Sequence, residues 1–203
     1  MTEPTVYVVE DDEAVRDSLQ LLLKAEGYRV VAYPEASSFL DAWNPRLNGC
    51  IVLDIRMPGM SGMELQKELL ARGCELPIIF VTGHGDVPLA VEAMQLGAVD
   101  FVQKPYRDQE LLDKIQKAMA LDAEKQNVRL EKQDIQRRME TLTPREREIM
   151  DMMIDGDANK VIAIDLNISQ RTVEIHRSRV MQKMGTHSLA QLVRMVILAR
   201  EEA

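Results

Sequence analysis

Cysteine, aromatic side chains and long apolar runs are scarce in this chain of 203 residues. Its two cysteines, Cys50 and Cys74, do not have the CxxC spacing of redox or zinc motifs, so we expect both to be buried core residues. No apolar run has the length of a membrane-spanning helix, and residues 1–6 show no signal pattern of basic followed by apolar residues. These absences lead us to expect a cytoplasmic protein that does not contact a membrane.

Positive charge is also in short supply, but the deficit is confined to one part of the chain. The net charge is −8 in total; residues 1–120 carry 19 acidic and 11 basic side chains, and residues 121–203 carry 14 of each. Residues 169–187 have a local net charge of +3, because they contain one acidic residue, Glu174, and four basic residues, Arg171, Arg177, Arg179 and Lys183. Since the field at a docking face matters more than the total charge, the overall acidity does not exclude a DNA-binding protein.

Residues 1–121 alternate between short apolar runs and helical patterns. The runs cover residues 5–9, 29–33, 50–53, 77–81 and 99–102. Apolar residues at helical spacing follow each run, first up to Gly27 and then over residues 35–43, 62–71, 88–96 and 108–121. Strands that are apolar along their whole length are typical of a sheet covered by helices on both faces. The pattern predicts an α/β fold with a doubly wound, five-stranded parallel sheet.

Polar side chains gather where the predicted strands end. Glu10 and Asp11 follow the first strand, Asp54 the third, Thr82 the fourth and Lys104 the fifth. The carboxyl ends of parallel strands meet at one edge, where such sheets bind their ligands. Carboxylates with an open face suit Mg²⁺, and a nearby cation and hydroxyl complete the groups needed to form an aspartyl phosphate. Asp54 is the only acid at the end of the third strand, so we predict that it accepts the phosphoryl group.

The acidic residues also permit other interpretations. Acids after a strand are common helix N-caps, and Asp12 fits that role. Phosphohydrolases of the haloacid-dehalogenase type also use an Asp nucleophile, but they need a second Asp two residues later as general acid. Arg56 stands at that position, which favours a long-lived phosphorylated state over turnover. A signalling protein whose C-terminal half binds protein or RNA is a further alternative.

Residues 122–140 differ in composition from the sequence before them. They contain no Gly or Pro and are dominated by Ala, Glu, Lys, Gln and Arg. A sparse, heptad-like apolar stripe consists of Leu121, Val128, Ile135 and Met139. The segment predicts an amphipathic linker helix between the domains 1–121 and 141–203. Pairing with a second copy and a role as a solvated spacer both remain open.

From residue 141 onward the pattern is entirely helical. Helices are predicted to start near Thr143 and end at Gly156, and then to cover residues 159–166, 169–184 and 188–199. Thr143 and Glu146 predict a capping box, with Pro at the first helical position. Ser188 and Gln191 predict a second capping box. The second and third helices, joined by a turn at residues 167–168, predict a helix-turn-helix.

The helix predicted over residues 169–184 has two distinct faces when it is projected at 100° per residue. Val173, Val180 and Met184 form one side and predict contact with the core. The opposite side is polar apart from one isoleucine and consists of Arg171, Ile175, Ser178, Arg179 and Gln182, with Glu174 at its flank. An isoleucine among polar side chains fits a surface that contacts a thymine methyl group. A solvent-exposed face with one stray apolar residue is the alternative.

The N-terminal motifs resemble the receiver signature of two-component response regulators. The resemblance covers roughly residues 4–121 and rests on residues 10–11, 53–62, 82–83 and 104–105. It implies that Asp54 is the phospho-acceptor, that Asp11 is a Mg²⁺ ligand with Glu10 beside it, and that the backbone carbonyl of Arg56 is a further ligand. Glu at position 10 departs from the commoner Asp, but that acid usually acts through a water molecule. The resemblance also implies that Lys104 pairs with the phosphate and precedes a cis proline.

A switch and a dimer contact are implied by the same resemblance. Thr82 and Phe101 correspond to the switch pair of receivers. A phosphoryl group on Asp54 would draw Thr82 towards it, and Phe101 would follow into the vacated space. We expect this movement to reshape the helix 87–96 and the strand 99–102, which would then form a symmetric homodimer contact.

The C-terminal motifs resemble the LuxR-type DNA-binding domain. The resemblance rests on residues 142–148, 159–163, 171–177 and 183–184, and residues 83–88 (GHGDVP) extend it to the FixJ subfamily of response regulators. It implies that the side chains near DNA phosphates are Lys160, Thr172, His176 and Lys183. It places nearest the bases Glu174, Ile175 and Ser178, beside the exposed Arg171 and Arg179. Arg177 is also among the predicted DNA-binding residues, although it projects inward on the helix, and a histidine such as His176 is also typical of a half-buried packing residue.

Together the two resemblances imply a phosphorylation-dependent transcriptional regulator; the subfamily leans to activation, and activator and repressor both remain open. Its partners would be a sensor histidine kinase, promoter DNA and RNA polymerase. Its chemistry would be limited to its own phosphorylation and slow dephosphorylation, so we do not expect an enzyme in the usual sense. The expected organisation is a receiver domain at 1–121, a helical linker at 122–140 and a helix-turn-helix domain at 141–203.

Overall fold

The computed structural model describes residues 3–83 and 87–201, which excludes His84, Gly85 and Asp86 of the FixJ-like segment. The chain forms two compact units, divided between Gln126 and Asn127. Helix α5 (Asp108–Glu140) continues without a break through this division, so its two parts belong to different units. No helix in the described part of the chain has both the length and the apolar character needed to cross a bilayer.

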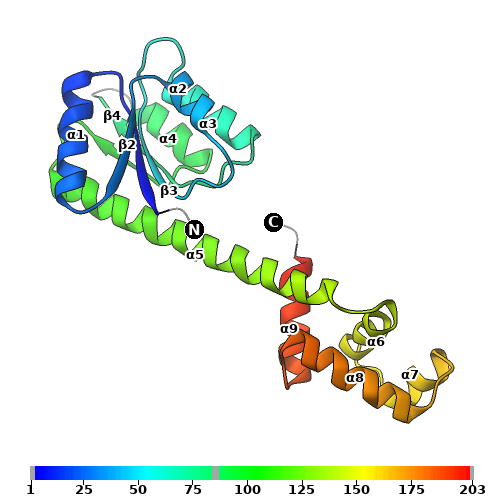
Figure 1. Cartoon of the computed structure of the whole chain (residues 1–203). Helices are drawn as coiled ribbons and strands as arrows, with labels where there is room; N and C mark the ends of the chain where they lie inside the picture. Colours follow the sequence, from blue (N-terminus) through cyan, green and yellow to red (C-terminus); the bar gives the residue numbers. More distant parts are fainter. Residues whose placement is uncertain (1–2, 84–86, 202–203) are drawn as a thin grey trace. The chain divides into compact units, whose positions relative to one another are not determined.

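The first unit contains the predicted five-stranded parallel sheet, in the order β2-β1-β3-β4-β5 (Figure 1). Its strands are β1 (Thr5–Val9), β2 (Arg29–Tyr33), β3 (Gly49–Asp54), β4 (Ile78–Thr82) and β5 (Asp100–Gln103). The helices between them are α1 (Glu13–Ala25), α2 (Ala36–Ala42), α3 (Gly62–Ala71) and α4 (Val87–Gln95), and α5 follows β5. The sequence prediction of a doubly wound α/β fold is therefore confirmed.

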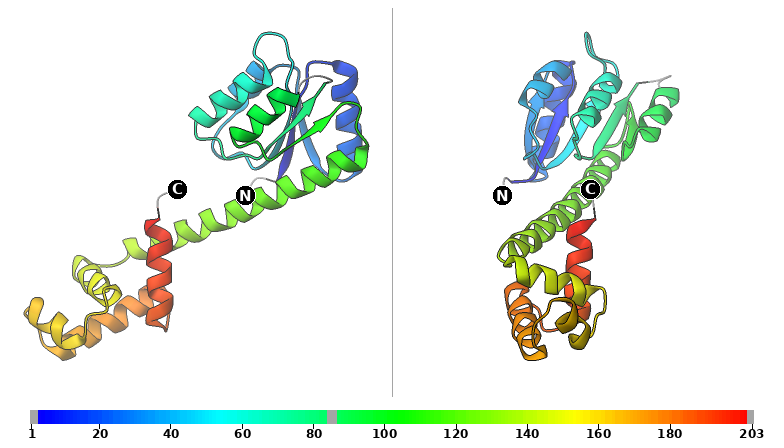
Figure 2. Two further views of the ribbon diagram at one scale, coloured as in Figure 1. Left: turned by 180° about the vertical axis from the view of Figure 1, so that it is seen from behind. Right: turned by 90° about the vertical axis from the view of Figure 1, so that its right-hand side faces the viewer.

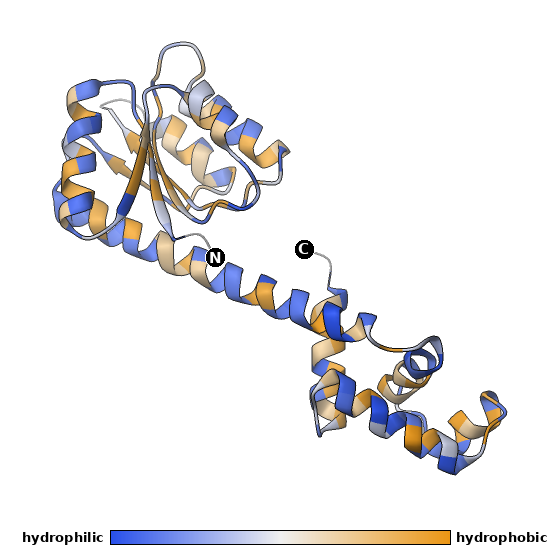
Figure 3. Ribbon diagram, in the orientation of Figure 1, coloured by the Kyte–Doolittle hydropathy of each residue, from blue (hydrophilic) through white to orange (hydrophobic). Residues whose placement is uncertain are grey.

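Helices cover both faces of the sheet, as the uniformly apolar strands predict (Figure 2). One face packs on α1 and α5, whose contributions include Leu23, Leu111 and Ile115, each fully buried. The other face packs on α2, α3 and α4, with Phe39 and Phe80 among its fully buried residues. Figure 3 shows the apolar colouring on the strands of the sheet, whereas the helices around them alternate between apolar and hydrophilic residues. Cys50 lies in this core as expected, whereas Cys74 is only half-buried.

Two helices of the first unit begin at side-chain caps. The carboxylate of Asp12 accepts a hydrogen bond from the Val15 backbone N–H at 3.1 Å, so Asp12 is the N-cap of α1. Ser61 and Glu64 form a complete capping box at the start of α3. These caps satisfy backbone N–H groups that have no partner within the helix. They also fix where the loops after β1 and β3 end; Glu10 and Asp11 lie in the first loop, and Asp54 directly precedes the second.

The second unit consists of the end of α5 and four further helices: α6 (Pro144–Ile154), α7 (Asn159–Asp165), α8 (Gln170–Met184) and α9 (Leu189–Arg200). The capping box of Thr143 and Glu146 is present at α6. The second predicted box, of Ser188 and Gln191, is wrong because the Ser188 side chain makes no cap hydrogen bond. The Oε1 atom of Gln191 instead accepts a hydrogen bond from the Thr186 hydroxyl at 2.8 Å.

The predicted apolar stripe of α5 does not form one continuous surface. Ile135 is 2% exposed and lies in the core of the second unit, with Met139 packed against that core. Val128, one heptad earlier, is 41% exposed. The second half of the stripe is therefore core of the helical unit, and only the part around Leu121 and Val128 faces solvent.

Candidate functional site

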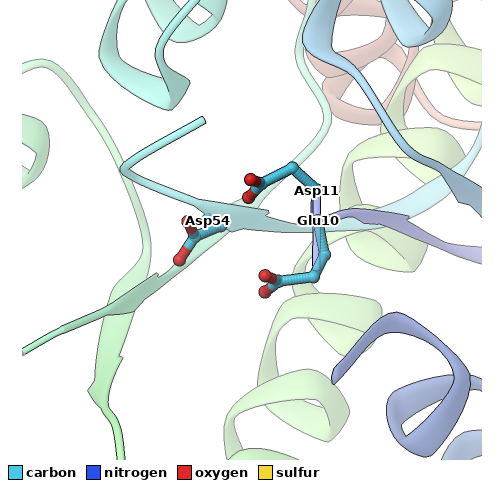
Figure 4. A group of neighbouring side chains, drawn as sticks. All are labelled: Glu10, Asp11 and Asp54. Carbon is cyan, nitrogen blue, oxygen red and sulfur yellow. The ribbon is translucent and has the colours of Figure 1, made fainter. Parts of the chain in front are cut away.

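Three carboxylates converge at the carboxyl edge of the sheet (Figure 4). Glu10 and Asp11 directly follow β1, and Asp54 is the last residue of β3. Because β1 and β3 are adjacent parallel strands with Val9 opposite Leu53, the residues after them lie side by side. One oxygen from each carboxylate lies within 4.8 Å of the others. Glu10 and Asp54 are buried, whereas Asp11 is exposed, so the cluster opens to solvent on one side.

Lys104 completes this cluster from the end of β5. Its Nζ atom lies 2.9 Å from Glu10 Oε2 and 3.1 Å from Asp54 Oδ1. The second oxygen of Asp54 accepts a hydrogen bond from the Arg56 backbone N–H at 3.1 Å. The Lys104–Pro105 peptide is cis, as the receiver resemblance predicts. All the residues expected at this edge from strands β1, β3 and β5 are therefore together.

Burial and charge act in opposite directions on these groups. Burial raises the pKa of Asp54, and the charge of Lys104 counteracts part of that rise. Burial likewise raises the pKa of Glu10, against the hydrogen bond from Lys104. Burial lowers the pKa of Lys104, but Glu10 and Asp54 together raise it above its ordinary value. The ammonium group therefore stays charged and offsets part of the cost of the buried carboxylates.

The cluster has the donor chemistry of a hard divalent cation. Its oxygens come from three carboxylates, and the exposed side of Asp11 leaves room for water or a phosphoryl oxygen. Mg²⁺ binds through a few carboxylates and retains several waters, so the residues fit this ion. Lys104 neutralises only part of the local negative charge, which leaves the cluster attractive to a cation.

Arg16 is a part of the site that sequence reasoning missed. Its Nη1 atom donates to the backbone carbonyls of Glu10 at 2.9 Å and Asp11 at 3.1 Å. Arg16 lies on the first turns of α1, which begins directly after the acidic pair. A basic residue one turn into that helix is the signal that could have identified it. The guanidinium group holds the loop that carries both acids.

Gly62 has a steric role behind Asp54. It is the first residue of α3, and a Cβ atom there would overlap the backbone carbonyl oxygen of Asp54. The Gly62 N–H donates to the carbonyl of Ile55 at 3.0 Å, which closes the loop. A residue without a side chain is therefore needed for α3 to start this close to the end of β3.

The predicted switch pair lies on the neighbouring strands β4 and β5. Thr82 is 1% exposed, and its hydroxyl donates to the carbonyl of Val102 over a long 3.5 Å. Phe101 is half-buried and packs against the core on the side of α2, α3 and α4. The long hydrogen bond is weak, so it offers little resistance to reorientation of the Thr82 hydroxyl.

The helix-turn-helix consists of α7 and α8, and α8 has the two faces that the sequence predicts. Val173, Val180 and Met184 are completely buried. The residues on the opposite side are exposed: Arg171, Glu174, Ile175, Ser178 and Arg179. Ile175, the apolar member of this set, is 47% exposed. Three flanking residues are half-buried: Thr172, His176 and Arg177.

Two lysines expected near DNA phosphates lie in different surroundings. Lys160 on α7 is exposed and makes no ion pair within the described residues. Lys183 in the last turn of α8 lies 2.6 Å from Glu146 and also donates to the carbonyl of Thr141 at 2.9 Å. The ammonium group of Lys183 is thus already paired inside the protein.

The expected dimer surface contains exposed apolar side chains. On α4, Val91 is 49% exposed and Met94 is 38% exposed. Helix α4 covers Val87–Gln95 and ends one residue before the predicted range 87–96, whereas strand β5 covers Asp100–Gln103 and lies one residue beyond the predicted range 99–102. Lys67 of α3 pairs with Glu92 at 3.1 Å beside this surface.

Comparison with known protein families assigns a domain to each part of the chain. Residues 6–116 match the response regulator receiver domain. Residues 140–196 match the bacterial regulatory proteins of the luxR family. The two matches cover the sheet with its acidic cluster and the helical unit with its helix-turn-helix.

Individual relatives match over nearly the whole chain. The transcriptional regulatory protein FixJ of Azorhizobium caulinodans is 48% identical and covers 96% of this chain and 92% of its own. Nodulation protein W of Bradyrhizobium diazoefficiens is 44% identical and covers 96% of this chain and 86% of its own. Among solved structures, the response regulator StyR has a TM-score of 0.88 at 44% identity, over 97% of this chain and 99% of its own. Full-length FixJ from B. japonicum has a TM-score of 0.60 at 46% identity and covers 98% of both chains.

Proposed function

Because the chain belongs to the FixJ subfamily of two-component response regulators, in which a receiver domain precedes a LuxR-type DNA-binding domain, we propose that phosphorylation of Asp54 controls its action on transcription. The observation that supports this proposal most strongly is the position of Asp54. Its carboxylate is bonded to Lys104 and lies beside Glu10 and Asp11, at the open carboxyl edge of a parallel sheet. The phosphoryl donor would be a sensor histidine kinase.

In the proposed transfer, an Asp54 carboxylate oxygen attacks the phosphorus of a phosphohistidine. An O–P bond forms as the P–N bond breaks, and the departing imidazole keeps the electron pair and takes up a proton. Lys104 balances negative charge on the phosphoryl oxygens, and the Arg56 N–H orients Asp54. Mg²⁺ held by Asp11, Asp54, the Arg56 carbonyl and, through water, Glu10 would supply further positive charge.

The test is labelling of the purified chain by a small phosphodonor in the presence of Mg²⁺. Asp54→Asn removes the nucleophile and should abolish the label. Asp12→Asn is the matched control, because Asp12 is adjacent to the cluster but caps α1, and Asn can make the same cap. Persistent labelling of Asp54→Asn would sink the assignment, as would equal loss in both variants.

The proposed output is binding of promoter DNA by α8 in the major groove. Ile175, Glu174 and Ser178 are exposed at its centre and would lie nearest the bases. The exposed cations Lys160, Arg171 and Arg179, together with Thr172 and His176, would lie along the phosphates. Arg177 is half-buried and would support the helix rather than read bases.

Phosphorylation would act through Thr82 and Phe101 on the surface formed by α4 and β5, which we propose as a homodimer contact. Exposed Val91 and Met94 supply apolar area there. A dimer bound to its promoter would present two recognition helices and recruit RNA polymerase as an activator. We expect this activity in the cytoplasm, where the DNA is, and the protein's only chemistry would be its own phosphorylation and slow dephosphorylation.

A further inference from the structure

We propose that Lys183 does not contact DNA, and that Lys183 and Glu146 form a charged clasp that positions the recognition helix α8. This proposal rests on the DNA-binding function proposed above. It assigns Lys183 a different role from Lys160, although both are the kind of residue expected near phosphates. It also makes Glu146, a capping residue of α6, a positioning residue for DNA recognition.

The clasp is a network of short contacts around one carboxylate. Glu146 Oε2 accepts hydrogen bonds from the Thr143 N–H at 2.9 Å and from Lys183 Nζ at 2.6 Å. Lys183 Nζ also donates to the carbonyl of Thr141 at 2.9 Å. One oxygen therefore joins the first turn of α6 to the last turn of α8, across 37 residues of sequence.

Burial makes this pairing hard to exchange for a DNA contact. The Glu146 side chain is 4% exposed and that of Lys183 is 34% exposed. If Lys183 moved to a phosphate, Glu146 would remain a buried charge without its cation, which is strongly unfavourable. The hydrogen bond from Lys183 is also the main reason that the pKa of Glu146 is lowered, so the carboxylate stays ionised. The pair is neutral as a whole and should release no counterion from DNA.

The position of the clasp explains how it would affect recognition. A second cation holds the same turn of α8, because Arg138 Nη1 donates to the carbonyl of Met184 at 2.9 Å. Val173 and Val180 fix α8 against the core, and the clasp fixes its C-terminal end against α6. The orientation of Ile175 towards DNA would depend on the core packing of α8 and on the clasp. Loss of the clasp should therefore weaken binding through orientation, without removing a phosphate contact.

The experiment compares Lys183→Met with Lys160→Met in the full-length phosphorylated chain. Each variant is titrated with a promoter duplex at several salt concentrations, and the slope of log affinity against log salt is measured. Lys160→Met should lower the slope by about 1, as expected for the loss of one phosphate contact. Lys183→Met should lower affinity at every salt concentration and leave the slope unchanged. A drop of about 1 in the slope of Lys183→Met would overturn the proposal.

A double-mutant cycle keeps the test decisive if a single variant unfolds. Glu146→Gln, Lys183→Met and the double variant are compared by chemical unfolding of the second unit, followed by hydrogen exchange. If the clasp exists, the double variant is no less stable than Lys183→Met alone. Lys183→Met leaves Glu146 as a buried carboxylate without its cation, and Glu146→Gln removes that charge. Additive effects would contradict the clasp. Absence of salt-dependent binding by the unaltered chain would instead refute the proposed DNA-binding function itself.

Discussion

At the scale of single residues, the geometry of the acidic cluster depends on two basic side chains, Lys104 and Arg16. Glu10 and Asp54 share one cation, Lys104, at 2.9 and 3.1 Å. Arg16 holds the backbone from which Glu10 and Asp11 project. These contacts set the spacing of the carboxylates before any ligand binds, which is the condition for efficient electrostatic stabilisation.

Replacing Arg16 by Met should weaken divalent-metal binding. Hydrogen bonds from a charged donor contribute roughly 1.5–3 kcal/mol, so we expect about a tenfold or greater loss of affinity. Binding of Mn²⁺ measured by electron paramagnetic resonance reports this directly, without any phosphorylation assay. Lys24→Met, which removes a cation from the far end of α1, is the control and should bind Mn²⁺ normally. Unchanged affinity in Arg16→Met would show that the loop holds its shape without the guanidinium.

Ile175 should contribute to sequence preference, and Lys160 to affinity for any DNA sequence. Ile175→Ala removes an apolar contact to a base, so it should cost roughly 1–3 kcal/mol on the preferred site and much less on scrambled DNA. Lys160→Ala should weaken binding to both duplexes alike. Titrations on promoter and scrambled DNA measure both effects. Equal losses on the two duplexes for Ile175→Ala would contradict its contact with a base.

At the scale of elements, α5 is attached to the sheet by a buried polar contact close to its exit from the first unit. The Gly49 N–H at the start of β3 donates to Asp122 Oδ2 at 2.8 Å, and Asp122 is 4% exposed. A side chain at position 49 would overlap the backbone of Thr5, and the φ of Gly49, 117°, is unfavourable for residues other than glycine. Because residue 49 is a glycine, α5 can approach β3 closely enough for Asp122 to accept the hydrogen bond from the Gly49 N–H.

Substitutions at Asp122 should separate its charge from its hydrogen bond. Burial raises the pKa of Asp122 in the folded state, so its contribution to stability is fully present below the unfolded-state pKa and is lost as pH rises through the folded-state pKa. Asp122→Asn keeps the acceptor without the charge, so it should match the unaltered chain in acid and exceed its stability near neutral pH. Asp122→Leu strands the Gly49 N–H and should cost roughly 1–3 kcal/mol at every pH.

Unfolding of the first unit can be followed selectively, because the only tryptophan of the chain, Trp43, lies in it. Denaturant titrations monitored by its fluorescence, between acid and neutral pH, measure the stability of each Asp122 variant. A stability difference between Asp122→Asn and the unaltered chain that does not grow with pH would show that desolvation of the carboxylate is not the cause.

At the scale of the whole molecule, the proposed activity requires two copies of the chain. Phosphorylated protein should sediment as a dimer, and its DNA site should be an inverted repeat with half-sites about one helical turn, 10–10.5 bp, apart. Val91→Asp places a charge on the exposed apolar face of α4 and should prevent dimerisation while Asp54 is still labelled. Leu21→Asp is the control, because Leu21 on α1 is 74% exposed and distant in sequence from that face. Monomers after full phosphorylation of the unaltered chain would rule out the dimer step.

The sequence alone was sufficient to predict the elements and the place of the acidic site. Apolar runs predicted the five strands, and caps such as Asp12 and Thr143 predicted helix starts, because these signals depend on neighbours a few residues apart. The edge shared by Glu10, Asp54 and Lys104 followed from one rule, that parallel strands end on the same side. The capping signal fails where another local hydrogen bond is available: Gln191 bonds to Thr186 and does not form a capping box with Ser188.

Only the tertiary structure decided which charged groups are already paired. Lys160 and Lys183 are indistinguishable as sequence signals, yet one is exposed and the other bonds to Glu146. The same holds for Ile135 and Val128, a heptad apart on α5, of which one is core and the other exposed. Periodicity specifies the face of a helix on which a residue lies. What covers that face depends on packing between residues that are distant in the chain, and local propensity contains no information about it.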